Sequence, residues 1–174
     1  RSSPPRTAAE ARPSRMPNTL IHLGLQGLAT RAAWRGADLG WVFAGCVIPD
    51  LPWIARRAWL ALAPPADLLG LQVAAGIQSS LFFCLALCAA LALATERPGR
   101  TFALLGVTSL GHLLLDAAEI KWANGALLAA PWSWALTNYG ALWPDSPFVI
   151  GLTAACAAAA VFLFLPAVRG APQP

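Results

Sequence analysis

Apolar residues along this chain occur in long unbroken runs rather than in the strict alternation that is typical of half-buried strands. The longest runs cover residues 68–95, 101–119 and 146–168, and the first and last of them contain no charged residue. A helix that crosses a bilayer needs about 20 consecutive apolar residues. We therefore expect each of these runs to form one membrane span.

Two shorter apolar stretches precede these runs. Residues 18–30 carry no charge and begin at Asn18, a good helix N-cap, but they are too few to span a bilayer. Residues 39–55 contain Pro49, Asp50 and Pro52. Because proline lacks an N–H group and restricts the residue before it, we expect the second helix to break or kink there. The two stretches together predict a hairpin.

The segment 120–145 differs in kind, because it combines proline and glycine with a cluster of aromatic residues: Trp122, Trp132, Trp134, Tyr139 and Trp143. Tryptophan and tyrosine prefer the headgroup region of a membrane. We expect this segment to be an interfacial cap over the end of the 101–119 helix, beside Asp116, and not a transmembrane helix.

Composition supports a membrane protein. The 174 residues are 57% hydrophobic and 11% charged, whereas soluble domains are about 25% charged. The predicted fold is an all-α, polytopic membrane helical bundle with about four to five membrane-embedded helices. Residues 1–15, with three prolines and four arginines, predict a disordered basic tail. Residues 16–170 predict a single membrane-embedded helical domain, multi-pass in the cell inner (plasma) membrane.

The net charge of +4 does not indicate a nucleic-acid-binding protein, because the basic residues lie mainly in the first 15 residues and at the ends of apolar runs. That distribution is typical of residues that set membrane topology. The lipid bilayer is the expected partner, with other membrane proteins as further candidates. The four cysteines all lie inside apolar runs, where we expect them to pack as small apolar residues.

Four polar residues fall where lipid-facing or buried apolar residues are expected: His22, Asp50, His112 and Asp116. A charge near the bilayer centre costs about 2.5–3.5 kcal/mol on insertion scales, so such residues need a reason to be there. His112 and Asp116 are four residues apart and share a helix face. With His22 and Asp50 they could form a site for one zinc or manganese ion. The alternatives are a hydrogen-bonded pair that joins helices and a proton or ion pathway.

The order of several short motifs resembles the YdjM-like (LexA-regulated) family of membrane-bound, metal-dependent hydrolases. The matching segments are Pro17-Asn18-Thr19 with His22, Ile48-Pro49-Asp50-Leu51, Gly111-His112 through Asp116, Asn124-Gly125 with Leu127-Leu128, and Pro131-Trp132. The resemblance implies that His22, Asp50, His112 and Asp116 are metal ligands. It also implies that Pro131 and Trp132 belong to a loop that closes over the site.

The chain departs from the family pattern at two places. Pro52 and Trp53 stand where the family has a second Asp and a His, and Gln78-Ser79-Ser80 stands where it has a His-containing segment. A site for a single divalent ion is therefore expected. The resemblance implies a membrane-embedded hydrolase-like protein acting on a phosphoester or lipid-type substrate, in which no residue stands out as a separate general base. The alternative is a non-catalytic small membrane subunit or scaffold of a larger complex.

Overall fold

The computed structural model describes residues 18–34, 36–63, 67–119, 125–142 and 146–168, and the predicted tail at residues 1–15 lies outside this part. The described chain is all-helical, as predicted, and its β-structure is confined to two isolated bridges. In chain order the elements are α1 (Asn18–Ala33), α2 (Leu39–Val47), the short 3-10 helix η2 (Ile48–Asp50), α3 (Leu51–Leu62), α4 (Leu68–Gln78), α5 (Leu81–Leu93), α6 (Pro98–Ala118) and α7 (Pro147–Val168).

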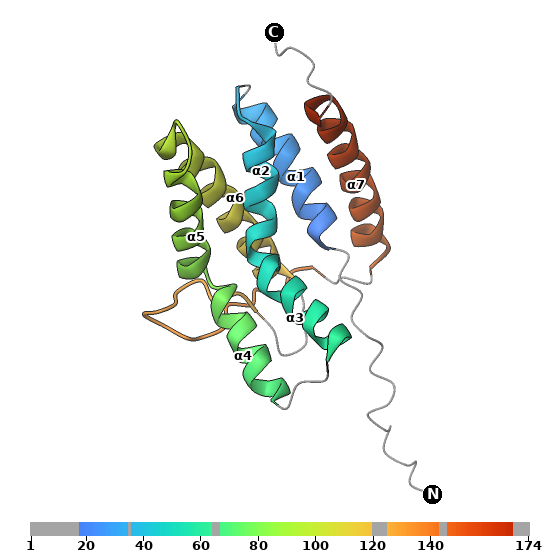
Figure 1. The fold of residues 1–174 in the computed structure, drawn as a ribbon. Coiled ribbons are helices and arrows are strands. Elements are labelled where there is room, and N and C mark those ends of the chain that lie inside the picture. Colours follow the sequence, from blue (N-terminus) through green and yellow to red (C-terminus); the bar gives the residue numbers. More distant parts are fainter. Residues whose placement is uncertain (1–17, 35, 64–66, 120–124, 143–145, 169–174) are drawn as a thin grey trace, which may run out of the picture.

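Helices α1, α2, α5, α6 and α7 run side by side as a bundle, and α3 and α4 extend from one end of it (Figure 1). Helix α6 packs against α2 and α5, and α1 packs against α7. The C-terminal end of α6 therefore lies near the start of α3 and near the loop 125–142. This end of the bundle carries the candidate site.

The predicted break at the proline-rich segment is confirmed. Helix α2 ends at Val47, the residues Ile48–Asp50 form η2, and α3 begins at Leu51. Pro49 cannot donate a hydrogen bond to the carbonyl of Gly45 four residues earlier, so the regular α-helical ladder cannot continue. The break brings Asp50 to the start of a new helix that leads away from the bundle.

The run over residues 68–95, predicted as one membrane span, is not one continuous helix. The segment forms two helices, α4 and α5, bent by 61° at Ser79-Ser80. Ser80 has an extended backbone, with φ −69° and ψ 155°. The backbone N–H of Leu81 donates to the carbonyl of Leu127 at 3.2 Å. This tertiary hydrogen bond takes the place of a helical one. The hydropathy of the run does not indicate the bend.

Residues 125–142 contain no helix, which confirms that this described part of the predicted cap is not a transmembrane segment. The segment covers the C-terminal end of α6. The N–H of Tyr139 donates to the Ala117 carbonyl at 2.6 Å, and the N–H groups of Ala141 and Leu142 donate to the Ala118 carbonyl at 2.8 and 2.9 Å. These bonds satisfy carbonyls that the helix end leaves unpaired. Its predicted place at a membrane interface stays a prediction.

Small residues allow two helix pairs to approach closely. A side chain on Gly24 of α1 would overlap the backbone of Cys156 in α7. A Cβ atom on Gly45 of α2 would lie 2.7 Å from the Leu105 carbonyl oxygen of α6. The first contact lies within a run of small residues in α7, Ala154 to Ala160, which packs against α1. The second contact fixes α2 against α6 one turn away from the candidate site.

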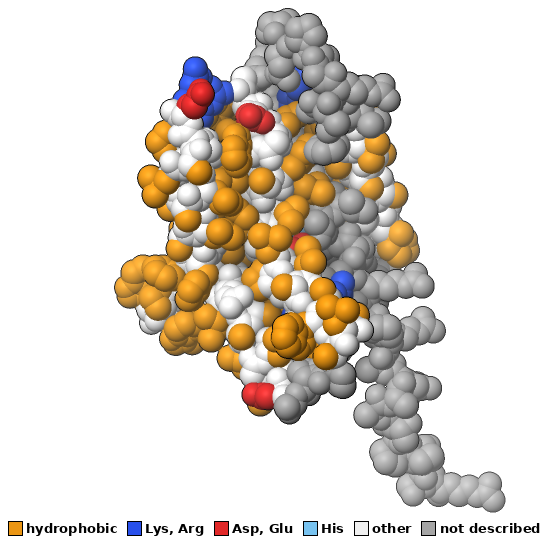
Figure 2. All heavy atoms as spheres, viewed as in Figure 1, with side chains coloured by type: hydrophobic (Ala, Val, Ile, Leu, Met, Phe, Trp, Pro, Cys, Tyr) orange, Lys and Arg blue, Asp and Glu red, His pale blue; other side chains and the backbone are white. Residues whose placement is uncertain are grey.

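By length and composition, α6 is the one described helix that could cross a membrane by itself, and half of its most apolar window is buried inside the protein. The bent pair of α4 and α5 passes the same test if it is counted as one span, and the core helix of a soluble protein would pass it too. Apolar side chains cover much of the visible face, while charged groups gather toward its two ends (Figure 2). The expectation of four to five embedded helices stays a prediction.

Candidate metal centre

Helices α1 and α6, together with the short helix η2 at the break, supply the four predicted site residues. His22 lies on the buried face of α1, one residue after Ile21. Asp50 ends η2, directly after the break that Pro49 causes. His112 and Asp116 lie four residues apart in the last turns of α6, which places both on one face. The site thus forms only when α1, η2 and α6 pack together.

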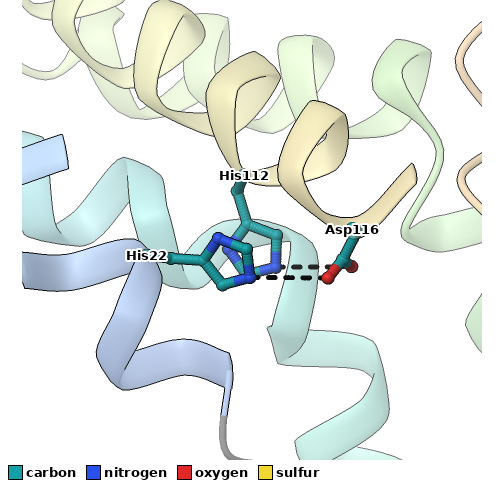
Figure 3. Close-up of side chains that lie close together, drawn as sticks. All are labelled: His22, His112 and Asp116. Carbon is teal, nitrogen blue, oxygen red and sulfur yellow. Dashed lines mark ion pairs between the residues drawn. The ribbon is translucent and has the colours of Figure 1, made fainter. Parts of the chain in front are cut away.

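The structure brings all four side chains together, as predicted. The Nε2 atom of His22 lies 3.4 Å from Oδ1 of Asp116. The Nε2 atom of His112 lies 3.5 Å from Oδ1 of Asp50 and 3.6 Å from Oδ2 of Asp116. The two imidazole rings stack at 3.8 Å between centroids, with Asp116 facing both (Figure 3). Each oxygen of Asp116 therefore faces a different histidine.

Burial of the cluster is uneven. Both histidines are 1% exposed, whereas the side chains of Asp50 and Asp116 are 15% and 22% exposed. The carboxylates therefore line the side of the cluster that solvent or a ligand can reach. The imidazoles form its inner wall.

The hydrogen bond on the far side of His112 fixes the state of its ring. The Nδ1 atom lies 2.5 Å from the carbonyl oxygen of Cys46. A carbonyl only accepts hydrogen bonds, so Nδ1 carries the proton and donates it. In the neutral ring, Nε2 then presents its lone pair to Asp50 and Asp116. A carbonyl behind the ring is the usual outer-shell partner of a metal-bound histidine.

The proline break explains why α2 can hold α6 in this way. Pro49 leaves the Gly45 carbonyl without its helical donor, and the hydroxyl of Ser109 donates to that oxygen at 2.9 Å. Ser109 and His112 lie one turn apart on α6, and they bond to the consecutive carbonyls of Gly45 and Cys46. The break that positions Asp50 thus also frees the Gly45 carbonyl, which ties α2 to α6 next to the Cys46 carbonyl that orients His112.

Gln26 is a site-supporting residue that the sequence interpretation missed. It lies one turn after His22 on α1 and is buried. With its amide oriented to satisfy both partners, it donates to the Thr108 carbonyl at 2.8 Å and accepts from the backbone N–H of His112 at 3.0 Å. Gly111 leaves room for this approach. The sequence does contain a sign of this role: Gln26 follows His22 by four residues, so both polar groups lie on one face of an otherwise apolar stretch.

The donor set fits a small divalent ion. His22, His112 and Asp116 each offer one ligand atom, and these atoms all lie within 4.8 Å of one another. Two ligands about 2.0–2.2 Å from a tetrahedral ion lie roughly 3.3–3.6 Å apart, and the three nitrogen–oxygen separations of 3.4 to 3.6 Å fall in that range. His22, His112 and Asp116 could therefore hold a metal ion, with Asp50 next to His112.

The ring of His22 also fits the role of a metal ligand. It is buried, and among the described residues neither of its nitrogens has a hydrogen-bond partner. Its distance of 3.4 Å from the Asp116 carboxylate exceeds the roughly 2.7–2.9 Å of a charge-assisted hydrogen bond. Buried polar groups are normally satisfied, and a shared ion would satisfy this one.

No family model, curated protein or solved structure matches this chain. The cysteines are accounted for by packing. All four cysteines are free and buried, and Cys84 and Cys88 belong to the apolar core around Leu105 and Leu113.

Proposed function

We propose that this protein is a divergent member of the YdjM-like, membrane-bound, metal-dependent hydrolases, and that it holds a single zinc or manganese ion. The observation that carries the proposal is the convergence of two stacked histidines and two carboxylates at the partly open end of the bundle. Imidazole with carboxylate is a donor set that suits both zinc and manganese. His22, His112 and Asp116 would hold the ion, with Asp50 as the fourth candidate ligand.

The proposed reaction is hydrolysis of a phosphoester. The oxygen of water bonds to phosphorus, the phosphorus–oxygen ester bond breaks, and the departing alcohol takes up a proton. A divalent ion bound at the cluster would polarise the phosphoryl oxygen and lower the pKa of a coordinated water to about 7.

The protein's own residues support this chemistry by positioning. Cys46 fixes the orientation of the His112 ring through its carbonyl oxygen. Asp116 spans the two histidines with its two oxygens. The more exposed side of the cluster, formed by the carboxylates, is where a phosphoester could enter.

The proposal places the chain in the inner membrane as a multi-pass protein. Apolar side chains on the outer faces of α5, α6 and α7 support it, because Leu93, Val107 and Phe162 are 80%, 68% and 76% exposed. The turn with Glu96, Arg97 and Arg100 lies at one end of α6, and His112 and Asp116 lie near its other end. The site would therefore sit close to one membrane face, near the exposed aromatic side chains of Trp132 and Tyr139.

A lipid phosphatase assay tests the proposed activity. We expect the detergent-purified protein, supplied with zinc or manganese, to release inorganic phosphate from phosphatidic acid, and a chelator to stop the release. Asp50→Ala and His112→Ala should each reduce the rate to background, because each removes a group that faces the proposed ion. Cys156→Ala is the control and should keep the activity, since Cys156 is a buried packing residue of α7.

A protein that binds metal but releases no phosphate would contradict the hydrolase proposal and leave the non-catalytic subunit as the better one. One observation already weighs against that alternative. Part of the small-residue run in α7 is covered within the chain, because Cys156 and Ala160 are buried and Gly24 of α1 packs on the Cys156 backbone. That part is not free to contact another subunit.

A further inference from the structure

An apolar groove of about 340 Å³ lies between the helix break and α5. Ile48, Leu51 and Pro52 line one side of it, and Phe83 and Leu87 line the other. Its volume falls in the range of ligand pockets, which are mostly apolar with a few polar groups. The side chains that line this groove carry no charge.

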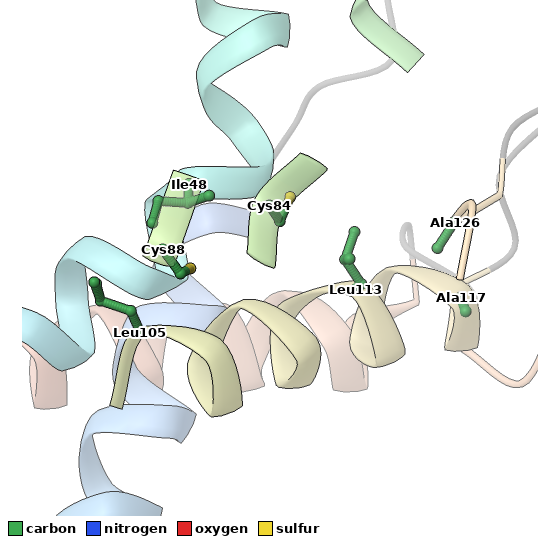
Figure 4. Packing of buried hydrophobic residues seen from close by; sticks show 7 residues of the cluster. All are labelled: Ile48, Cys84, Cys88, Leu105, Leu113, Ala117 and Ala126. Carbon is green, nitrogen blue, oxygen red and sulfur yellow. The ribbon is translucent and has the colours of Figure 1, made fainter. Parts of the chain in front are cut away.

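The groove and the candidate metal centre share one piece of backbone. Ile48 and Leu51 line the groove and lie on either side of Pro49-Asp50, and Asp50 faces His112. Ile48 and Cys84 also belong to the core cluster with Leu113, the neighbour of His112 (Figure 4). The apolar groove therefore begins at Leu51, the residue that follows Asp50.

The break between α4 and α5 adds polar groups to the same region. Gln78 is the polar residue among those that line the groove. The next two residues, Ser79 and Ser80, are 9% and 0% exposed, and their hydroxyls have no hydrogen-bond partner among the described residues. A buried hydroxyl without a partner costs free energy. The groove is thus apolar along its walls, with the polar side chain of Gln78 beside the break between α4 and α5.

We propose that this groove holds one long acyl chain of the substrate, with the phosphoester headgroup at the metal centre. This inference rests on the proposed function and names its substrate class as an amphiphile with at least one hydrocarbon chain. A hydrocarbon chain suits the groove better than a peptide does. The surface of a hydrocarbon chain needs no hydrogen bonds, whereas a peptide brings backbone N–H and C=O groups that uncharged apolar walls leave unsatisfied.

Ala55 offers a way to fill the groove without disturbing the core. It lines the groove from α3 and is exposed, so the variant Ala55→Trp adds an indole there with little strain. Ala58 lies on the same helix and is exposed but does not line the groove. Ala58→Trp is therefore the matched control, with the same added side chain and helix.

The probe is a long-chain lysophosphatidic acid with a photoactivatable diazirine on its acyl chain, and its cross-links are mapped by peptide mass spectrometry. We expect cross-links in the wild type to concentrate on residues 48–55 and 83–87. Binding should weaken about tenfold in Ala55→Trp, a loss of about 1.4 kcal/mol, and stay unchanged in Ala58→Trp. Unlabelled long-chain lysophosphatidic acid should compete, and glycerol 3-phosphate should not.

Cross-links spread evenly over the exposed apolar faces, or equal labelling of both variants, would overturn the proposal and indicate ordinary annular lipid. Cross-links between two copies of the chain would instead identify a dimer contact, and would overturn it as well. Metal content is measured on the same samples. Labelling of the groove without bound metal would support the acyl site and contradict the proposed metal-dependent function. Bound metal without labelling of the groove would contradict the acyl site and leave the proposed function in place.

Discussion

Replacing His112 with alanine is expected to abolish metal binding. His112 lies close to both carboxylates of the cluster, at 3.5 Å from Asp50 and 3.6 Å from Asp116. Its loss leaves a single histidine to anchor the ion. We expect the affinity for zinc to fall more than about 100-fold, because loss of an outer-shell partner alone costs roughly 10–100-fold. Titration calorimetry on the detergent-solubilised protein measures the change.

The fold should survive this substitution, which separates a metal site from a structural pair. Loss of the imidazole leaves the Cys46 carbonyl without its donor, at a cost of about 1–3 kcal/mol, while the packing of α1, α2, α6 and α7 remains. Helical circular dichroism should therefore stay near that of the wild type. A wild type that binds no metal, combined with a His112→Ala variant that is merely less stable, would identify His112 and Asp116 as a pair that joins helices.

Gly45→Ala should destabilise the bundle and weaken the site together. The added Cβ atom would lie 2.7 Å from the Leu105 carbonyl oxygen and 2.9 Å from the Leu105 Cα atom, so α2 would have to move away from α6. Overpacking of this kind costs about 1–3 kcal/mol, against a gain of roughly 1 kcal/mol from replacing glycine in a helix. The thermal denaturation midpoint should fall, and metal affinity should fall with it.

Gly151→Ala is the matched control for this prediction. Gly151 lies in α7, and a Cβ atom there would meet no other atom within 4 Å. Alanine at this position should raise the stability of the protein slightly through helix propensity and leave metal binding unchanged. If Gly45→Ala behaved like Gly151→Ala, the close contact between α2 and α6 would not be what holds the Cys46 carbonyl against His112.

Much of the site was predictable because it depends on residues that are conspicuous in an apolar chain. Both histidines and the carboxylates Asp50 and Asp116 are costly among apolar neighbours, and that cost predicts convergence. Pro49 predicts the helix break through its missing N–H group. The proline and glycine content of the 120–145 segment likewise predicts the absence of helix, as found over residues 125–142.

Other features depend on contacts that no local pattern records. The bend at Ser79-Ser80 lies inside an uninterrupted apolar run and depends on the hydrogen bond from Leu81 to the distant Leu127 carbonyl. The Cys46 carbonyl that orients His112 is a backbone group, and side-chain identity does not mark it. The role of Ser109 likewise appears only when α2 and α6 are packed together.

The most direct test of the central claim is the metal content of the purified wild-type protein, measured by inductively coupled plasma mass spectrometry after removal of loosely bound ions. The proposed site predicts close to one equivalent of zinc or manganese per chain. X-ray absorption at the edge of that metal should show nitrogen and oxygen ligands at about 2.0–2.2 Å, without sulfur at about 2.3 Å. A metal content near zero, in protein that is folded and has been offered both ions, would contradict the claim.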